Sequence, residues 1–189
     1  MQVPAEVMVG WESTYVPTIV RALAARPDAA VDLIRTSRAS FDPADPFPTI
    51  VRTTLEVLWY GVFGTNDAVA KLGGNPYGNE TRVYRGSRDD VQLNNRVRRL
   101  SADPAARAAL SQYETTAGVA NPLVILHTTG DDVVPVSEAV TYLLRAQPGA
   151  RGRIIPIPIA RYGHCAFTRG EALVAFAVLV SQAESQSPG

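Results

Sequence analysis

Two stretches in the C-terminal part of the chain carry an acid and a histidine that could act together. Asp131 lies in HTTGDDVVP (127–135), directly after an apolar run, and His164 lies in RYGHCAFT (161–168). A carboxylate that accepts a hydrogen bond from an imidazole orients the ring and stabilises its protonated form. The histidine then serves as a general base and, later in the reaction, as a general acid. Asp132 is the competing choice for the acid.

The residues around this pair predict a strand, a helix, a second strand and a second helix. In chain order these elements are expected over 122–129, 136–146, 153–160 and 170–182, the last as a buried helix. Pro156 and Pro158 restrict the second strand to an edge or irregular position. A βαβ unit places its strands parallel, so both strands end at the same edge of the sheet, where ligands bind in open α/β folds. Asp131 and His164 follow those two strand ends.

The N-terminal part has a different, mainly helical pattern. One apolar stripe (Val16, Ile19, Val20, Leu23) and a second one that begins at Ile50 have helical spacing. Pro27-Asp28 and Ser101–Pro104 predict helix starts, whereas 41–48 and 72–79 are typical of a break and a loop. EVMVGW (6–11) is a candidate third strand. We therefore expect an α/β protein with a mainly helical segment, 1–118, and a βαβα part, 119–189.

The stretches Asp131-Asp-Val-Val-Pro135 and Gly163-His164 resemble the acid and histidine motifs of the α/β-hydrolase family, in the order found in that family. YETTAG (113–118) and NPYGN (75–79) look like a bacterial group within it that has a helical insertion. The resemblance implies a partial α/β-hydrolase fold, a helical lid, and hydrolysis of a small-molecule ester or other acyl bond. His164 would be the base, and Asp131, which the spacing to Pro135 favours over Asp132, would orient it.

The nucleophile that this family requires is missing from the chain. The family carries a serine in a Gly-x-Ser-x-Gly turn between a strand and a helix, and no serine here has a glycine two residues before it. Ser13 is the nearest candidate, after Gly10. Cys165 follows a strand, but we expect it to be a small buried residue behind the histidine. The sequence thus matches the insertion and C-terminal strands of a hydrolase without the half that bears the nucleophile.

Other interpretations of the same residues remain open. Asp131 or Asp132 could cap the helix at 136–146, and His127, inside an apolar strand, fits a core histidine. The chain could instead be a non-catalytic binding or assembly module whose exposed sheet edge pairs with an N-terminal hydrolase half or a second copy. A metal site is a weaker option, because no HxxxH or CxxC spacing occurs.

Composition narrows the possible partners. Eighteen basic residues balance eighteen acidic ones, which gives no basic surplus for nucleic acid or an anionic membrane. A single cysteine excludes an internal disulfide. The stretch 1–12 has neither the basic nor the apolar region of a signal peptide, so no export signal is expected, and no cofactor motif is present.

Overall fold

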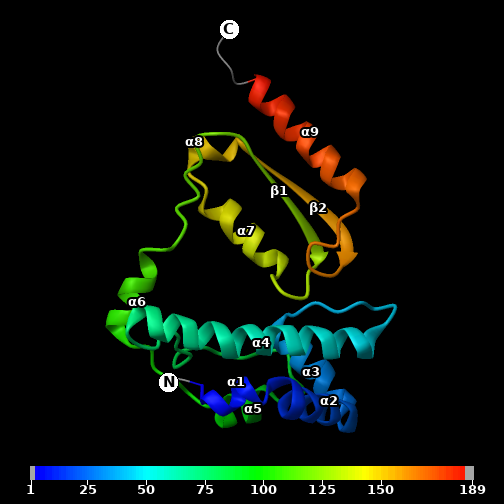
Figure 1. Cartoon of the computed structure of the whole chain (residues 1–189), viewed down its shortest axis with the longest axis vertical. Helices are drawn as coiled ribbons and strands as arrows, with labels where there is room; N and C mark the ends of the chain where they lie inside the picture. The colour runs from blue at the N-terminus through cyan, green and yellow to red at the C-terminus, as the bar shows by residue number, and fades with distance from the viewer. Residues whose placement is uncertain (1–2, 186–189) are drawn as a thin grey trace. The chain divides into compact units, whose positions relative to one another are not determined.

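The computed structural model describes residues 3–185 and shows a mixed α/β protein, mostly helical, with a two-stranded parallel sheet (Figure 1). The chain divides into two units, Met1–Glu114 and Thr115–Gly189. Among the described residues, no helix combines the length and the apolar character needed to cross a membrane.

The first unit consists of helices and loops. Its elements are α1 (Ala5–Val9), the π-helical turn η1 (Trp11–Tyr15), α2 (Val16–Ala25), α3 (Pro27–Ser37), α4 (Pro46–Leu72), α5 (Asp90–Arg96) and α6 (Pro104–Ser111). Prolines open α3, α4 and α6, where the missing backbone N–H has no helical partner to lose. The predicted helix starts at 27 and 104 and the loop at 72–79 are confirmed. Gly73 ends α4 with a φ of 73°, a left-handed conformation that favours glycine.

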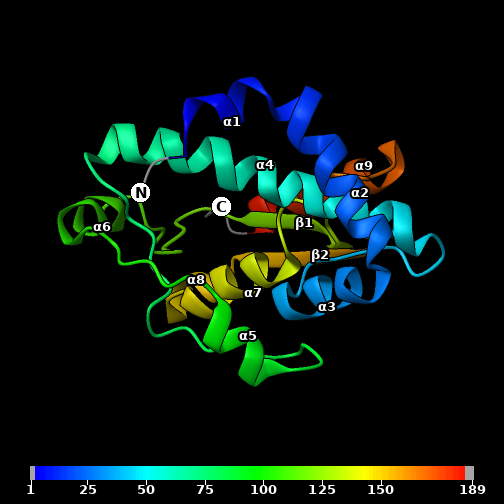
Figure 2. The ribbon, with the colours of Figure 1, turned by 90° about the horizontal axis from the view of Figure 1, so that it is seen from below.

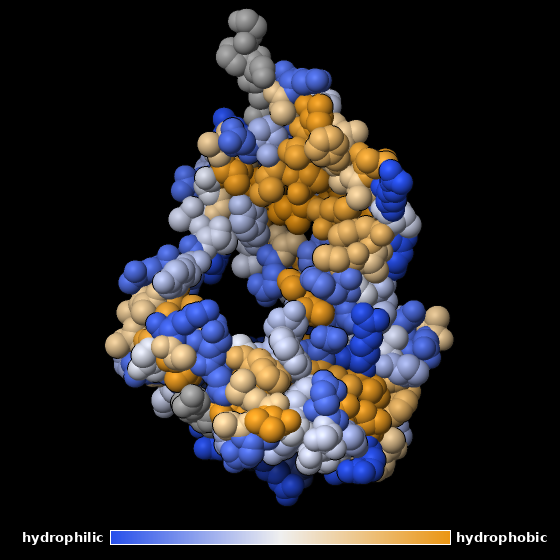
Figure 3. All heavy atoms as spheres, in the orientation of Figure 1, coloured by the Kyte–Doolittle hydropathy of each residue, from blue (hydrophilic) through white to orange (hydrophobic). Residues whose placement is uncertain are grey.

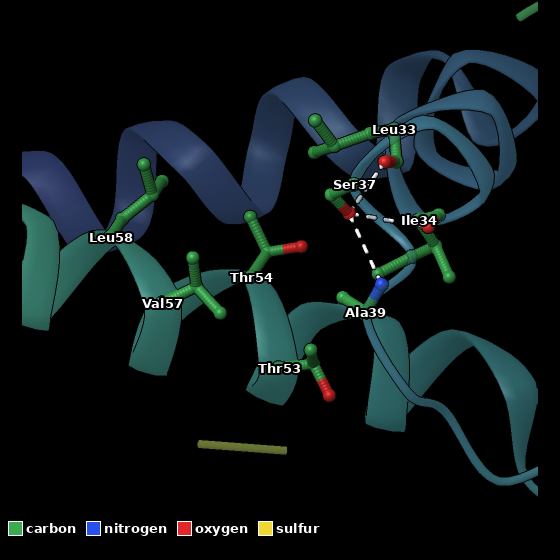
Figure 4. A pocket seen from close by; sticks show the side chains of 8 residues that line it. All are labelled: Leu33, Ile34, Ser37, Ala39, Thr53, Thr54, Val57 and Leu58. Atoms are coloured by element: carbon green, nitrogen blue, oxygen red, sulfur yellow. Dashed lines mark hydrogen bonds between the residues drawn. The ribbon is translucent and has the colours of Figure 1, made fainter. Parts of the chain in front are cut away.

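The core of this unit lies where α2, α3 and α4 meet. Its buried members are Leu23, Ala30, Ile34 and Ile50. Beside it lies a cavity of about 80 Å³ between α3 and α4, lined by Leu33, Ile34, Ser37, Ala39, Thr53, Thr54, Val57 and Leu58 (Figure 4). Both buried threonines bond to backbone carbonyls, Thr53 Oγ1 to Ser40 O and Thr54 Oγ1 to Ile50 O, each at 2.7 Å. The cavity walls are therefore largely apolar.

The aromatic residues of α4 pack on one another. The Trp59 and Phe63 rings stack at 4.7 Å between centroids, and Trp11 meets Phe63 edge to face at 6.2 Å. Trp11 is buried, and its contact with Phe63 joins η1 to α4. Trp59 and Tyr60 keep about two fifths and half of their surface exposed.

The expected third strand at 6–11 is wrong. Residues Ala5–Val9 form α1, and the chain continues into η1. The Gly10 N–H donates to Glu6 O at 2.9 Å, so helical turns satisfy the backbone locally, without a partner strand. The burial of Trp11 against Phe63 favours this helical path over an extended one.

The second unit is built on two parallel strands, β1 (Leu123–Gly130) and β2 (Ile154–Tyr162). The helices α7 (Val136–Arg145) and α8 (Pro148–Arg151) connect the strands, and α9 (Arg169–Ser185) follows β2. Helices α7 and α9 both pack against β1 and lie on opposite sides of the strand pair (Figure 2). The predicted strand, helix, strand and helix are confirmed, as is the edge position of β2.

The expectation that α9 is a buried helix is wrong for this chain. Only Ala175 is buried on it, while Leu173, Val174 and Phe176 keep 57%, 61% and 62% of their surface exposed. A two-stranded sheet is too narrow to cover a 17-residue helix that is apolar on several faces.

The start of α6 offers a test of local stability. The Asp103 carboxylate accepts hydrogen bonds from Ala105 N at 2.9 Å and Ala106 N at 3.2 Å, which caps the helix. We expect Asp103→Ala to lower the free energy of unfolding by about 1 kcal/mol, whereas Asp103→Asn, an equally good cap, should change it little. Urea unfolding followed by circular dichroism measures both. Equal losses in the two variants would contradict a capping role.

Candidate active site

The parallel pairing of β1 and β2 brings Asp131 and His164 into contact at one edge of the sheet. His164 Nδ1 lies 2.9 Å from Asp131 Oδ2 and 3.1 Å from Oδ1. Asp131 is 4% exposed, whereas the His164 side chain keeps 42% of its surface. The buried carboxylate can therefore orient the ring, while the opposite nitrogen, Nε2, makes no contact with this carboxylate and lies 3.6 Å from Cys165 Sγ.

The Asp131 carboxylate is held by the turn that follows it. Its Oδ1 accepts hydrogen bonds from Val133 N at 2.9 Å and Val134 N at 2.7 Å. Helix α7 begins after Pro135 and has no side-chain cap. The alternative that an aspartate caps this helix is therefore wrong: Asp131 closes the turn before the helix and has its second oxygen on His164.

Asp132 has a different task from Asp131. Its Oδ1 accepts a hydrogen bond from the backbone N–H of His164 at 2.7 Å, and its side chain is buried. The two adjacent aspartates thus hold the histidine twice, Asp131 through the ring and Asp132 through the main chain. The sequence suggested Asp132 as a competing acid or as a cap of the following helix, and neither interpretation predicted this bond to the main chain of His164.

The two strand ends are tied to each other beside the pair. Thr128 Oγ1 donates to Gly163 O at 2.6 Å, and Gly163 N donates to Gly130 O at 3.0 Å. Gly130 lies at a register irregularity, where a Cβ would come within 3.0 Å of Arg161 O and Tyr162 Cα. A larger residue there would push the strand ends apart. In the sequence, these two positions can be recognised as a threonine within an apolar run and a glycine directly before the acid.

A salt bridge fixes the turn that carries His164. Arg161 donates to both oxygens of Glu171, at 2.8 and 3.0 Å, and also to Ala166 O. The Arg161 hydrogen bonds, together with one from Thr168 N, lower the pKa of Glu171 to about 2. This pair joins the end of β2 to the start of α9 across the turn 163–168.

Cys165 differs from its expected environment. It is exposed rather than buried, has a left-handed φ of 50°, and places Sγ 3.6 Å from His164 Nε2. The left-handed backbone at Cys165 turns the thiol toward the ring. Among residues 3–185, no serine hydroxyl hydrogen-bonds to either ring nitrogen of His164.

The other candidates, Ser13 and His127, have different local environments. Ser13 is exposed in the π-helical turn η1, not at a strand-to-helix turn, and its hydroxyl is 3.5 Å from Thr14 Oγ1. His127 Nδ1 lies 2.7 Å from the carbonyl of Thr128, and its ring is half-buried. In the part of the chain that the structure describes, no group of three or more His, Cys, Asp or Glu side chains could hold a metal ion.

The Asp131 carboxylate gives a testable pH dependence. Burial opposes its ionisation, but hydrogen bonds from Val134 N, His164 and Val133 N outweigh burial and lower its pKa below the ordinary value. The ionised carboxylate therefore stabilises the fold fully above its ordinary pKa of about 3.9, and this contribution disappears as pH falls through the lower folded value. Asp131→Asn should reduce stability near neutral pH, with the difference from the unmodified chain shrinking below about pH 4.

Urea unfolding at a series of pH values measures this difference. Asp67→Asn is the control for loss of one carboxylate, because Asp67 forms only an exposed pair with Lys71. It should not reproduce the acid-dependent difference. A gap between Asp131→Asn and the unmodified chain that widens on acidification would contradict the assignment.

Comparisons of the chain with models of protein families, with curated proteins and with solved structures found no match.

Proposed function

We propose that the chain provides the acid and histidine of an acyl hydrolase that acts by a nucleophile, His and Asp mechanism. The observation that carries the proposal is the contact of His164 Nδ1 with the buried Asp131 carboxylate at 2.9 Å, on a histidine side chain that keeps 42% of its surface exposed. An imidazole held in this way removes a proton from an attacking group and returns it to the leaving group. A carboxylic ester or a related small acyl compound is the substrate class that this chemistry fits.

The resemblance of Asp131–Pro135 and Gly163-His164 to α/β-hydrolase motifs supports the same proposal. In this interpretation Thr115–Gly189 corresponds to the last two strands of such a fold, and the helical unit to its insertion. The attacking group would come from a second polypeptide segment that contains the strand-to-helix serine turn. The partners of the proposed enzyme are thus this segment and the acyl substrate.

The proposed base can be tested on the chain as it is, with p-nitrophenyl acetate. Water replaces the absent nucleophile in this assay, and general-base catalysis contributes about 10² to 10⁴-fold to such reactions. We expect His164→Ala to lower the hydrolysis rate by about 10²-fold. His127→Gln, which removes the other histidine, is the matched control and should keep the rate. Equal rates for the unmodified chain and His164→Ala would refute the proposal.

The position of Cys165 favours a second candidate, in which this chain has its own nucleophile. The exposed Sγ lies 3.6 Å from His164 Nε2. His164 would take the thiol proton, and the thiolate would attack the acyl carbon to form a tetrahedral intermediate. This intermediate collapses to a thioester as the C–O bond breaks and the alcohol leaves with the proton from His164. Water, deprotonated by His164, attacks the thioester and restores the thiol.

Replacement of the thiol separates the two candidates. If His164 acts as a base toward water, Cys165→Ala keeps hydrolysis near the rate of the unmodified chain, and this is the result we expect. A thiol nucleophile requires instead that Cys165→Ala lose activity as fully as His164→Ala. It also requires that mass spectrometry of the intact chain, quenched during turnover, detect an acyl group on Cys165.

A further inference from the structure

The two edges of the β1 and β2 pair differ in their backbone groups. In a parallel pair, the N–H and C=O of one residue point to the same side, and successive residues alternate. Leu123 N donates to Arg153 O at 2.8 Å, and Leu123 is in register with Ile154. Over 123–128, the odd-numbered residues of β1 therefore direct their backbone N–H and C=O groups toward β2. The residues of β1 that direct N–H and C=O away from β2 are Val124, Leu126 and Thr128.

The same register places the two prolines of β2 on its outer edge. Ile155 and Ile157 are in register with Val124 and Leu126, so their backbone groups face β1. Pro156 and Pro158 alternate with them and face outward, where the ring removes the N–H that an added strand would need. The outer edge of β2 is thus closed to strand addition, without the loss of any hydrogen bond to β1.

The outer edge of β1 has no such protection at Val124 and Leu126, whereas the outward carbonyl of Thr128 lies 2.7 Å from His127 Nδ1. No proline or charged residue occurs in Leu123–Gly130, and the run 123–126 is apolar at every position. Helix α9, which packs on β1, adds exposed apolar side chains, and apolar atoms gather over the strands and α9 (Figure 3). The exposed part of Leu173, Phe176 and Val180, which share one face of α9, amounts to roughly 300 Å², more than a third of the 800 Å² that each partner buries in a stable dimer.

We propose that the open edge of β1 binds the same edge of a second copy of the chain. The two β1 strands would pair antiparallel across a twofold axis and form a four-stranded sheet in the order β2, β1, β1, β2. A head-to-tail chain of copies needs two different open edges, and each copy has one. The proline edges would then lie at both outer ends of the sheet and stop growth at the dimer. This inference does not rest on the proposed hydrolase activity: it assigns to a second copy the edge that a separate segment bearing the nucleophile would otherwise extend.

Light scattering after size exclusion tests the assembly. We expect twice the chain mass of 20.3 kDa at micromolar concentration. Leu126→Pro removes an outward N–H and no bond to β2, so it should give a folded monomer. A monomeric unmodified chain would overturn the proposal, as would a dimer that Leu126→Pro leaves intact, since that dimer would use another surface.

Amide exchange in the unmodified chain tests the same edge even if Leu126→Pro does not fold. The N–H groups of Val124 and Leu126 should exchange more slowly as concentration rises, because the second copy accepts their hydrogen bonds. The outward N–H of Ile154, on β2, is the matched control and should exchange at a rate independent of concentration. Protection of Ile154 alone, or of none of the three, would overturn the proposal.

Replacement of the prolines tests why growth stops. Pro156→Ile combined with Pro158→Ile restores two outward N–H groups on β2 while keeping an apolar strand. This double variant should form species larger than the dimer at concentrations where the unmodified chain does not. A double variant that remains strictly dimeric would show that the prolines do not close that edge.

Discussion

The register between β1 and β2 is the constraint on which the candidate site depends. Parallel pairing places the C-terminal ends of both strands at the same edge of the sheet. The irregularity between Thr128 and Gly130 sets how far each strand extends before the chain turns. Asp131 and His164 are the first functional side chains beyond those ends. A shift of one residue would reverse the side on which each group points, so the contact between carboxylate and imidazole exists only in this register.

The polar groups at the two strand ends hydrogen-bond to one another and to the adjacent turns. Asp131 closes its own turn, Asp132 holds the main chain of His164, and Thr128 bonds to Gly163 O. Buried polar side chains are costly without hydrogen bonds, and each of these three makes at least one to the opposite strand end or to the adjacent turn. The local polar network therefore contributes both stability and the geometry of the candidate pair.

The sequence predicted the parts of this arrangement that follow from repeated patterns. The apolar runs gave both strands, the prolines gave the helix starts at 27 and 104, and the βαβ rule brought the strand ends together. Sequence patterns did not predict the features of the fold that depend on a single contact or a single residue. The path of 6–11 depends on Trp11 packing against Phe63, and the exposure of Cys165 depends on one left-handed residue. The roles of the two adjacent aspartates differ by one peptide unit, which no spacing rule resolves.

The two backbone N–H groups that hold Asp131 have a consequence for proton transfer. Val133 N and Val134 N fix one carboxylate oxygen whether or not the imidazole is charged. The acid is therefore a carboxylate held in a fixed position, which does not have to move when the proton does. When the ring gains or loses a proton at Nε2, the heavy atoms of the pair can stay where they are. Little reorganisation energy would then accompany the transfer, the property by which fixed polar groups in a protein outperform water.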